Sequence, residues 1–276
     1  MDWCERITGF REGDYASTRA RLSIEGDRLV ARGHGRRRGA GRLKLPTLDA
    51  LRESVPLPRR QRCTVVCIAA DARALHAEPG LAGALFQVAS QFNRLEMVSP
   101  GIGPEDGVTR YQHDRRQGPA CAMAAGAATV YRNYFAPVCG GQGQTAQRQL
   151  DALASLGEPL SARLGVPVAA LWTMRNGYAL RTAEGLARIA RLLDDADEAT
   201  LLAASEQIDA GGSGTALLTR LGGGAFGNDE SWIDDAMARA LKLVEHAGLD
   251  VRLVSHGSVH PAMRALAQRW ADGAAA

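Results

Sequence analysis

The stretch TALLTRLGGGAFGNDESW, residues 215–232, determines the fold expected for this chain. Its first part, residues 216–218, is apolar and predicts a short buried strand. The glycine-rich segment 222–227 follows and predicts a turn, because glycine accepts backbone conformations that strain other residues. Asn228 or Asp229 then provides an N-cap, and the acidic residues at this point favour the first turn of a helix.

The residues after this turn have the periodicity of an amphipathic helix. Ile233, Met237 and Val244 recur at helical spacing, together with Ala240 and Leu241, so the helix has one apolar face. Residues 250–255, DVRLVS, predict a second strand. A strand, a glycine-rich turn, a helix and another strand form the pattern of a layered α/β domain.

The same turn has the composition of an anion site. Glycines let backbone N–H groups approach a phosphate, and the free N–H groups and dipole of a helix N-terminus favour negative charge. A glycine-rich turn also occurs simply as a tight connection between a strand and a helix. The sequence leaves both interpretations open.

The composition is that of an ordinary soluble globular protein, with 46% hydrophobic and 23% charged residues. No segment approaches the roughly 18 consecutive apolar residues that a membrane span requires. The first residues, MDWCERITGF, lack a basic region followed by an apolar one, so they do not form a secretory signal. We therefore expect a cytoplasmic protein with no membrane partner.

Positive charge is concentrated in the first part of the chain. Residues 1–62 contain 15 Arg and Lys against 8 Asp and Glu, and the excess peaks in residues 32–42, RGHGRRRGAGR. Such a run can contact nucleic acid or another anionic partner. No aromatic residue lies between its arginines, which favours a solvated, flexible loop.

The cysteines and histidines give no sign of a metal site. The five cysteines are odd in number and form no C-x-x-C pair, so we expect reduced and mostly buried thiols. Cys63 and Cys67 fall on the same face of an expected strand and are assigned to the core. The six histidines lack the spacing of zinc ligands, and no metal or cofactor is expected.

Apolar runs and turn residues predict the remaining elements. The first 62 residues predict a β-hairpin, 19–25 and 28–32, then the basic loop and a short helix over 46–52 capped by Thr47. Residues 64–70 predict a strand buried on both faces. Further strands are expected at 84–90 and 166–174, and helices at 120–134, 147–164, 184–193, 197–208 and 261–272. The domains expected are a basic, β-rich extension over 1–62 and an α/β domain over 63–276.

Three motifs, in this order, resemble those of a known family. Residues 86–93, FQVASQFN, form a strand that ends at an asparagine; GGGAFGND follows at 222–229, and DVRLVSHG at 250–257. This order resembles a macrodomain, and in its last third the poly(ADP-ribose) glycohydrolase branch. The resemblance covers about residues 63–256, with its specific part confined to 86–96 and 222–229. It implies a three-layer mixed sheet flanked by helices.

The resemblance also implies a ligand, ADP-ribose. In the glycohydrolase branch a loop of the AFG type, followed by an acidic residue, wraps the diphosphate of that ligand. Asn93, at the carboxyl end of a strand, would bond the ribose, and Phe226 would pack on a ribose or adenine face. In the absence of such a role, Asn93 is a turn residue that caps its own backbone and Phe226 a loop anchor in the core. The ligand-binding residues expected on this basis are Asn93, Gln117, Gly222, Gly223, Gly224, Ala225, Phe226, Gly227 and Asn228.

The sequence departs from the family where catalysis is concerned. The glycines expected after the asparagine are absent, and Arg94-Leu95-Glu96-Met97 stands there instead. The paired glutamates of the glycohydrolases are also absent as a pair. Hydrolysis at the anomeric carbon needs an acid for the leaving group or a base for water. The candidate catalytic residues are therefore three isolated acids, each of which also suits a solvated surface position: Glu96, Glu105 and Asp106.

Three functions follow from these patterns. The chain is an ADP-ribosyl hydrolase, a non-catalytic reader of ADP-ribose or a related nucleotide, or a protein that binds nucleic acid through residues 32–42. The resemblance favours binding of ADP-ribose over its hydrolysis. A serine hydrolase is excluded because no G-x-S-x-G motif occurs, and a P-loop NTPase because no G-K-[S/T] follows a glycine run.

Overall fold

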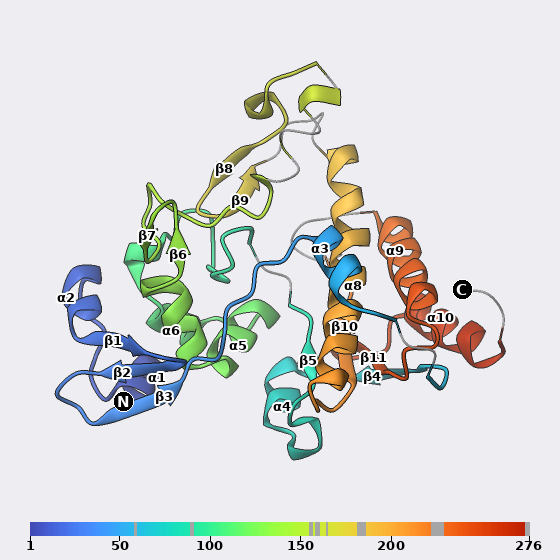
Figure 1. The fold of residues 1–276 in the computed structure, drawn as a ribbon, viewed down its shortest axis with the longest axis horizontal. Coiled ribbons are helices and arrows are strands. Elements are labelled where there is room, and N and C mark those ends of the chain that lie inside the picture. Colours follow the sequence, from blue (N-terminus) through green and yellow to red (C-terminus); the bar gives the residue numbers. More distant parts are fainter. Residues whose placement is uncertain are drawn as a thin grey trace. The chain divides into compact units, whose positions relative to one another are not determined.

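The computed structural model of the chain describes residues 1–57, 60–88, 91–154, 157, 161–163, 165–180, 186–221 and 229–273, and only the backbone of 186–195. The chain forms two compact units (Figure 1). Unit 1 comprises Met1–Lys44 and Ala89–Leu186, and unit 2 comprises Leu45–Val88 and Ala187–Ala276. The expected division into 1–62 and 63–276 does not follow these units, because each unit combines two separate parts of the chain.

Unit 2 is built on a four-stranded parallel sheet. Its strands are β4 (Thr64–Ala69), β5 (Leu85–Phe86), β10 (Thr215–Thr219) and β11 (Asp250–Ser255), in the order β4-β11-β10-β5. The described pairings are all parallel, so the sheet is parallel over these strands rather than mixed as predicted. Parallel neighbours need long crossover connections, which helices supply here. The predicted α/β class is confirmed.

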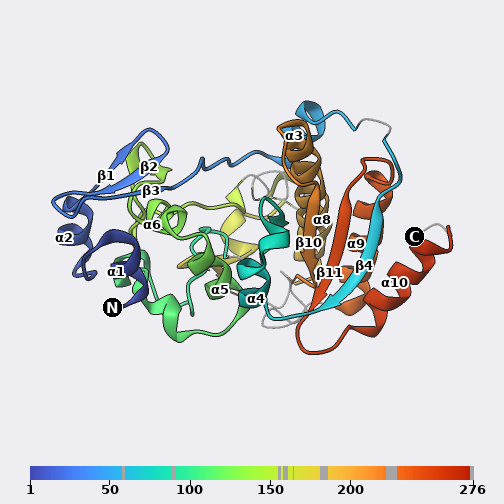
Figure 2. The same ribbon diagram turned by 90° about the horizontal axis from the view of Figure 1, so that it is seen from below.

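Three helices cover one face of this sheet: α8 (Leu186–Asp209), α9 (Glu230–Leu243) and α10 (Pro261–Ala271). Figure 2 shows β10, β11 and β4 side by side, with α9 and α10 lying along them. The apolar stripe predicted for α9 is confirmed, because Met237, Ala240, Leu241 and Val244 pack in the core against the sheet. Asp229 is the N-cap of this helix.

The opposite face of the sheet has a smaller cover. A short helix, α4 (Ala72–Ala77), and a 3-10 turn, η1 (Pro79–Leu81), pack a few apolar side chains against Leu217 and Val254. Strand β4 lies at one edge of the sheet, and its Val66 is 45% exposed. The prediction that this strand is buried on both faces is therefore wrong.

Helix α8 replaces the two helices predicted over 184–193 and 197–208. It runs continuously because the polar residues between the two predicted segments are helix-compatible and no proline or glycine interrupts them. Leu51 of helix α3 (Leu48–Ser54) and Val55, the residue that follows the helix, pack against Leu202 of α8. The predicted cap of α3 is confirmed, because the Thr47 side chain accepts a hydrogen bond from the Ala50 N–H.

Unit 1 begins with two short helices, α1 (Trp3–Thr8) and α2 (Tyr15–Ala20), and a three-stranded antiparallel sheet. The predicted hairpin is confirmed as β1 (Leu22–Glu25) and β2 (Arg28–Ala31). The arginine-rich run contributes a third strand, β3 (Arg36–Gly39), whereas a flexible loop was predicted. Pairing with β2 satisfies its backbone, so the arginines are held on a strand rather than in a loop.

The core of unit 1 joins the N-terminal residues to the middle of the chain. Trp3, Phe10 and Leu29 are buried together with Tyr111 and Tyr134. The helix predicted over 120–134 consists of α5 (Gln117–Ala124) and α6 (Ala127–Tyr134), which are separated at Gly126 with φ of 57°. The first 44 residues are thus part of this core rather than an extension outside it.

The rest of unit 1 consists of short elements. These are η2 (Pro104–Asp106), η3 (Thr109–His113), β6 (Pro137–Val138), β7 (Gly141–Gln142), η4 (Val168–Ala170), β8 (Thr173–Arg175) and β9 (Tyr178–Leu180). The buried strand predicted over 166–174 is wrong, because this region forms η4 and then a hairpin that turns at Asn176-Gly177. The helix predicted over 147–164 lies partly outside the described residues, and an antiparallel bridge joins Thr145 to Arg148 at its start.

No helix within the described ranges is both long and apolar enough to span a bilayer. The five cysteines are all free thiols, and Cys4, Cys63 and Cys121 are buried. This confirms the prediction of free, mostly buried thiols. Burial, followed by the charge of Glu12 for Cys4 and of Glu96 for Cys121, raises the pKa of each thiol to about 12.

These environments predict a strong difference in thiol reactivity. Cys139 is exposed, so we expect it to react first with an aromatic disulfide reagent at about pH 8, where buried thiols stay protonated. Cys4 and Cys121 should react only when the protein unfolds. The measurement is the time course of labelling, with Cys139→Ser as the control that removes the fast phase. A fast phase that persists in this variant would contradict the prediction.

Candidate functional site

The candidate anion site lies at the carboxyl edge of the parallel sheet in unit 2. Strand β10 ends there at Thr219, and helix α9 begins at Glu230 after its cap, Asp229. The glycine-rich segment connects these two ends. The predicted ligand-binding residues in it lie outside the described residues: Gly222, Gly223, Gly224, Ala225, Phe226, Gly227 and Asn228.

The two ends of this connection are tied to each other. Arg220 forms an ion pair with Asp234 of α9 and donates a hydrogen bond to the Glu230 carbonyl oxygen at 3.4 Å. The Asp229 carboxylate accepts hydrogen bonds from the Ser231 N–H and hydroxyl at 2.9 and 2.6 Å, and these bonds lower the pKa of Asp229. The end of the strand and the N-terminus of the helix are therefore held to each other by Arg220.

Gln87 supports the same edge and was not identified from the sequence. It follows β5 directly, and its side-chain oxygen accepts a hydrogen bond from the Thr219 N–H at 2.9 Å. Its amide nitrogen donates to the carboxylate of the buried Asp197 in α8 at 2.6 Å. The signal that could have found it is a polar residue immediately after a strand, at the end where parallel sheets bind ligands.

Asn93, predicted to bind a ligand, lies in unit 1 and is fully buried. Its side-chain oxygen accepts a hydrogen bond from the Leu95 N–H at 3.1 Å, which is the bond of a turn that caps its own backbone. Its amide nitrogen donates to Gln149 at 2.9 Å. In this arrangement Asn93 organises the turn that follows it, and its role in ligand binding stays a prediction.

The turn after Asn93 holds two residues in an unusual backbone conformation. Arg94 has φ of 62° and Glu96 has φ of 60°, in the left-handed region that glycine adopts without strain. These positions lie in the stretch where the resemblance to macrodomains led us to expect glycines. The local conformation is therefore one that glycine favours, although the residues are not glycine.

Glu96 lies in a buried and polar part of unit 1. Only 3% of it is exposed. Burial raises the pKa of Tyr111 and of Cys121. The negative charge of Glu96 raises both pKa values further, whereas the positive charge of Arg132 lowers them. Burial is the main cause of the raised pKa of Tyr111, whose hydroxyl donates to the Leu95 carbonyl. The carboxylate of Glu96 is therefore buried, whereas Glu105 and Asp106, the other two candidate acids, are exposed.

Glu105 and Asp106 are exposed and bind backbone groups. Both carboxylate oxygens of Glu105 accept from the Ala146 N–H, at 2.9 and 2.8 Å. Asp106 accepts from the Gly103 N–H at 2.9 Å and pairs with Arg110 at 3.1 Å. These contacts stabilise the turn that contains η2, and the predicted catalytic role of the two acids stays untested.

The structure brings only some of the predicted residues together. Asn93 and Glu96 share one turn, Glu105 and Asp106 share another, and Gln117 is the first residue of α5. Gln144 links two of these regions in unit 1, because its amide nitrogen donates to the carbonyl oxygens of Asn93 and Arg132. The glycine-rich segment belongs to unit 2.

Glu12 holds the loop of unit 1 in place and was also missed by sequence reasoning. Its carboxylate accepts hydrogen bonds from the Val108 N–H at 2.9 Å, the Thr109 N–H at 2.7 Å and the Tyr134 hydroxyl at 2.6 Å. Nothing local marks this residue in the sequence, because its partners are about a hundred positions away. Glu12 fastens the N-terminal segment to the loop that carries Glu105 and Asp106.

The arginine-rich strand does not present its charges on a single face. In the register of β2 and β3, Arg36 and Arg38 lie opposite Ala31 and Leu29, whereas Arg37 lies opposite Val30 on the other face. Arg37 also pairs with Glu25. The three arginines of β3, which suggested nucleic-acid binding, are therefore distributed over both faces of the sheet.

A comparison with models of known protein families, with curated proteins and with solved structures finds no match to this chain. Within the described ranges, no group of three or more His, Cys, Asp or Glu side chains is placed to hold a metal ion. The site is therefore interpreted from its own residues and geometry.

Proposed function

We propose that this chain binds ADP-ribose or a related nucleotide diphosphate at the carboxyl edge of its parallel sheet. The backbone N–H groups of Gly222, Gly223, Gly224, Ala225, Phe226, Gly227 and Asn228 would hold the diphosphate. The observation that carries the proposal is that the inner strand β10 ends just before this segment in the chain and helix α9 begins just after it.

The physical argument rests on the charge of these two ends. In open α/β sheets ligands bind beyond the carboxyl ends of the strands. Helix α9 has 14 residues, so its N-terminus carries a full helix dipole that favours an anion. The charge of Arg220 beside the segment is balanced by its ion pair with Asp234, so the attraction for an anion rests on the backbone N–H groups and the helix dipole. No lysine inside the segment is needed, because backbone N–H groups supply the hydrogen bonds.

The turn at residues 93–96 gives further support. The resembling family places glycines after its asparagine, and Arg94 and Glu96 adopt the left-handed conformation that glycine favours. The turn therefore has, without glycines, two positions at which glycine would be free of strain. This agreement concerns the backbone and supports the resemblance independently of the glycine-rich segment.

We propose hydrolysis of an ADP-ribosyl bond as a second step, with Glu96 as the candidate acid or base. Glu96 is buried among polar and charged groups, an environment in which carboxylates take on acid–base roles. Glu105 and Asp106 are instead engaged with backbone N–H groups. If Glu96→Gln leaves binding intact and no hydrolysis is detectable in the wild type, the chain is a reader of ADP-ribose.

The proposal predicts the outcome of a calorimetric titration of ADP-ribose into the wild type and Gly224→Glu. A carboxylate at residue 224 would repel the diphosphate and block the close approach of the backbone. We expect binding to the wild type and a loss of about 100-fold or more in affinity in the variant.

Gly39→Glu is the matched control. Gly39 lies on β3 of unit 1, and a side chain there meets nothing within 4 Å, so it introduces the same charge away from the proposed site. Its affinity should equal that of the wild type. Absence of binding to the wild type would contradict the proposed function. Equal binding by Gly224→Glu and the wild type would show that the ligand binds outside this segment.

A further inference from the structure

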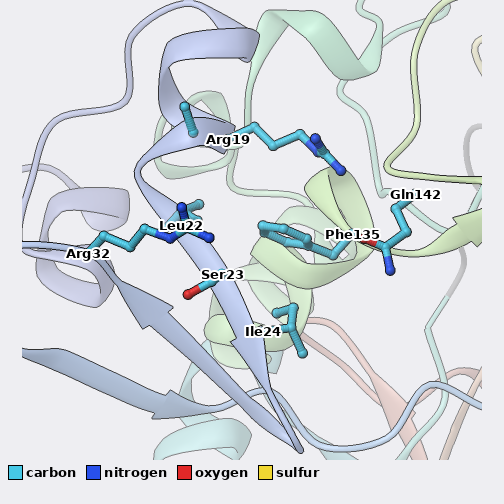
Figure 3. Close-up of a pocket in the computed structure, with 8 residues that line it drawn as sticks. Arg19, Leu22, Ser23, Ile24, Arg32, Phe135 and Gln142 are labelled. Atoms are coloured by element: carbon cyan, nitrogen blue, oxygen red, sulfur yellow. The ribbon is translucent and has the colours of Figure 1, made fainter.

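A cavity of about 400 Å³ lies in unit 1, between strand β1 and the residue that follows helix α6. Residues far apart in the chain form its walls, with Arg19 from α2, Ile24 from β1, Arg32 after β2, Phe135 after α6 and Gln142 from β7. Figure 3 shows the Phe135 ring facing β1, with Gln142 beyond it and Arg19 at one end. Pockets that bind small molecules have volumes of roughly 300–1,000 Å³, so this cavity is large enough for one.

The wall of this cavity is positively charged. Arg19 and Arg32 line it, and no acidic side chain does so among the described residues. Glu25, which follows the lining part of β1, forms an ion pair with Arg37 outside the cavity. Two guanidinium groups therefore face the cavity with no carboxylate in its wall to balance them. A concave site lined by charges of one sign concentrates ligands of the opposite sign, here anions.

Arg19 is held in one orientation by the protein itself. Its Nε donates a hydrogen bond to the Tyr134 carbonyl oxygen at 3.0 Å, and its guanidinium lies 5.4 Å from the centre of the Phe135 ring, within the range of a cation–π contact. These contacts use one of the five N–H donors of the side chain and leave those on its terminal nitrogens for a ligand. Because the guanidinium is oriented in advance, less side-chain entropy is lost when an anion binds.

Arg32 and Gln142 supply the other polar groups of the wall. The Arg32 N–H donates to the Arg21 carbonyl oxygen at 2.8 Å, which fixes the point where its side chain begins. Arg32 is exposed, and its side chain has no hydrogen-bond or ion-pair partner among the described residues. The Gln142 carbonyl oxygen accepts a hydrogen bond from Arg148 at 3.2 Å, which holds the backbone of Gln142 at the cavity. The cavity thus combines one oriented guanidinium, one unpaired guanidinium and one side-chain amide.

We propose that this cavity binds the phosphate group of a small phosphorylated molecule. A phosphate monoester carries a charge of about −1.5 to −2 near pH 7, which matches the two guanidinium groups. Its oxygens accept hydrogen bonds from Arg19 and Arg32 together, in the charge-assisted, two-pronged contacts that guanidinium groups form with phosphate. The organic part of the ligand lies against Ile24 and Phe135. The proposal is independent of the ADP-ribose site, because every residue it uses belongs to unit 1.

Charge and exposure favour this ligand over two others. A molecule with one carboxylate has a single negative charge, so it balances only one of the two arginines. A single-stranded nucleic acid has phosphates for the arginines, but its bases need exposed aromatic rings on which to stack. Phe135 is only 8% exposed, and the guanidinium of Arg19 lies over its ring. The aromatic wall therefore gives a base little surface.

The test is an NMR titration of the full-length, isotope-labelled protein with glucose 6-phosphate, followed through the Nε–H signals of the arginines. We expect the signals of Arg19 and Arg32 to shift and to reach a plateau. Inorganic phosphate should move the same two signals, because the phosphate group is what the cavity recognises. Glucose is the neutral match and should move neither. Absence of shifts with both phosphate probes, or shifts confined to other arginines, would overturn the proposal.

Variants locate the binding site on the protein. Arg32→Gln should weaken the binding of glucose 6-phosphate about tenfold, because it removes one of the two charged partners. Arg28→Gln is the matched control, since Arg28 is exposed on β2 outside the cavity and its loss should leave affinity within about twofold. Gly224→Glu should bind this probe as the wild type does, which distinguishes a failure here from a failure of the ADP-ribose site. Equal affinity of Arg32→Gln and Arg28→Gln, or tighter binding of oligothymidylate than of the probe, would rule out the proposed site.

Discussion

Gly177→Ala is expected to lower the free energy of unfolding by about 3 kcal/mol, because the new methyl group has no space. A Cβ at this position would lie 2.3 Å from Cγ of Asn93, and the φ of 76° strains any residue other than glycine. Asn93 is fully buried and cannot move aside without breaking its hydrogen bonds to Gln149 and the Leu95 N–H. Urea unfolding followed by circular dichroism measures the loss.

Gly140→Ala separates the steric effect from the backbone strain. Gly140 has a similar φ of 73°, but a Cβ there meets nothing within 4 Å. We expect this control to cost about 1 kcal/mol, the usual effect of alanine in the left-handed region. Equal losses in the two variants would show that Asn93 yields readily, which would in turn favour its availability to a ligand.

Glu12→Ala is expected to have a similarly large effect, about 3 kcal/mol. The variant leaves the Val108 and Thr109 N–H groups and the Tyr134 hydroxyl without their acceptor. Val108 and Tyr134 belong to the buried core of unit 1, so water replaces the lost bonds poorly. The midpoint of thermal unfolding and the free energy from urea titration both measure the effect.

Glu25→Ala is the control for this variant. Glu25 also forms a contact, an ion pair with Arg37, but both side chains are about half exposed. An exposed ion pair contributes at most about 1 kcal/mol, so the control should unfold close to the wild type. Tyr134→Phe should give an intermediate loss, because it removes one of the three bonds to Glu12. A wild-type stability for Glu12→Ala would show that the loop does not depend on this carboxylate.

The elements that the sequence predicted correctly are those specified by local signals. The strand, the helix and the second strand expected over residues 215–255 are confirmed, with Asp229 as the cap, whereas the glycine-rich turn predicted between them lies outside the described residues. The hairpin of β1 and β2 and the Thr47 cap of α3 are confirmed as well. In each case the periodicity and the turn or cap residue act within a few positions of the chain, so no distant contact is needed to read them.

The elements that were predicted wrongly depend on distant neighbours. Strand β3 forms because β2 accepts it as a partner, and nothing in a run of arginines indicates that pairing. The apolar run of β4 suggested burial on both faces, but its position at the edge of the sheet is set by which strands follow. Gly126 breaks the predicted helix at a point where alanines on both sides favour helix.

The candidate site divides in the same way. The glycine-rich segment was found from its composition; the strand before it and the helix after it are described, and the segment itself stays a prediction. Glu12 and Gln87 were not found, because their hydrogen-bond partners are about a hundred positions away in the chain. The left-handed conformation of Arg94 and Glu96 also escapes sequence reasoning, since neither residue type marks it.

The interleaved course of the chain has a consequence for how this protein is made. Because each unit takes one part from residues 1–88 and another from later in the sequence, a ribosome releases neither unit complete until most of the chain has been synthesised. The apolar surfaces of three N-terminal residues, Trp3, Phe10 and Leu29, are covered only after Tyr111 and Tyr134 have been synthesised. During that interval those surfaces are open to chaperones and to aggregation. No single cut of the gene separates the two units, so a fragment ending at any point would carry an unfinished core.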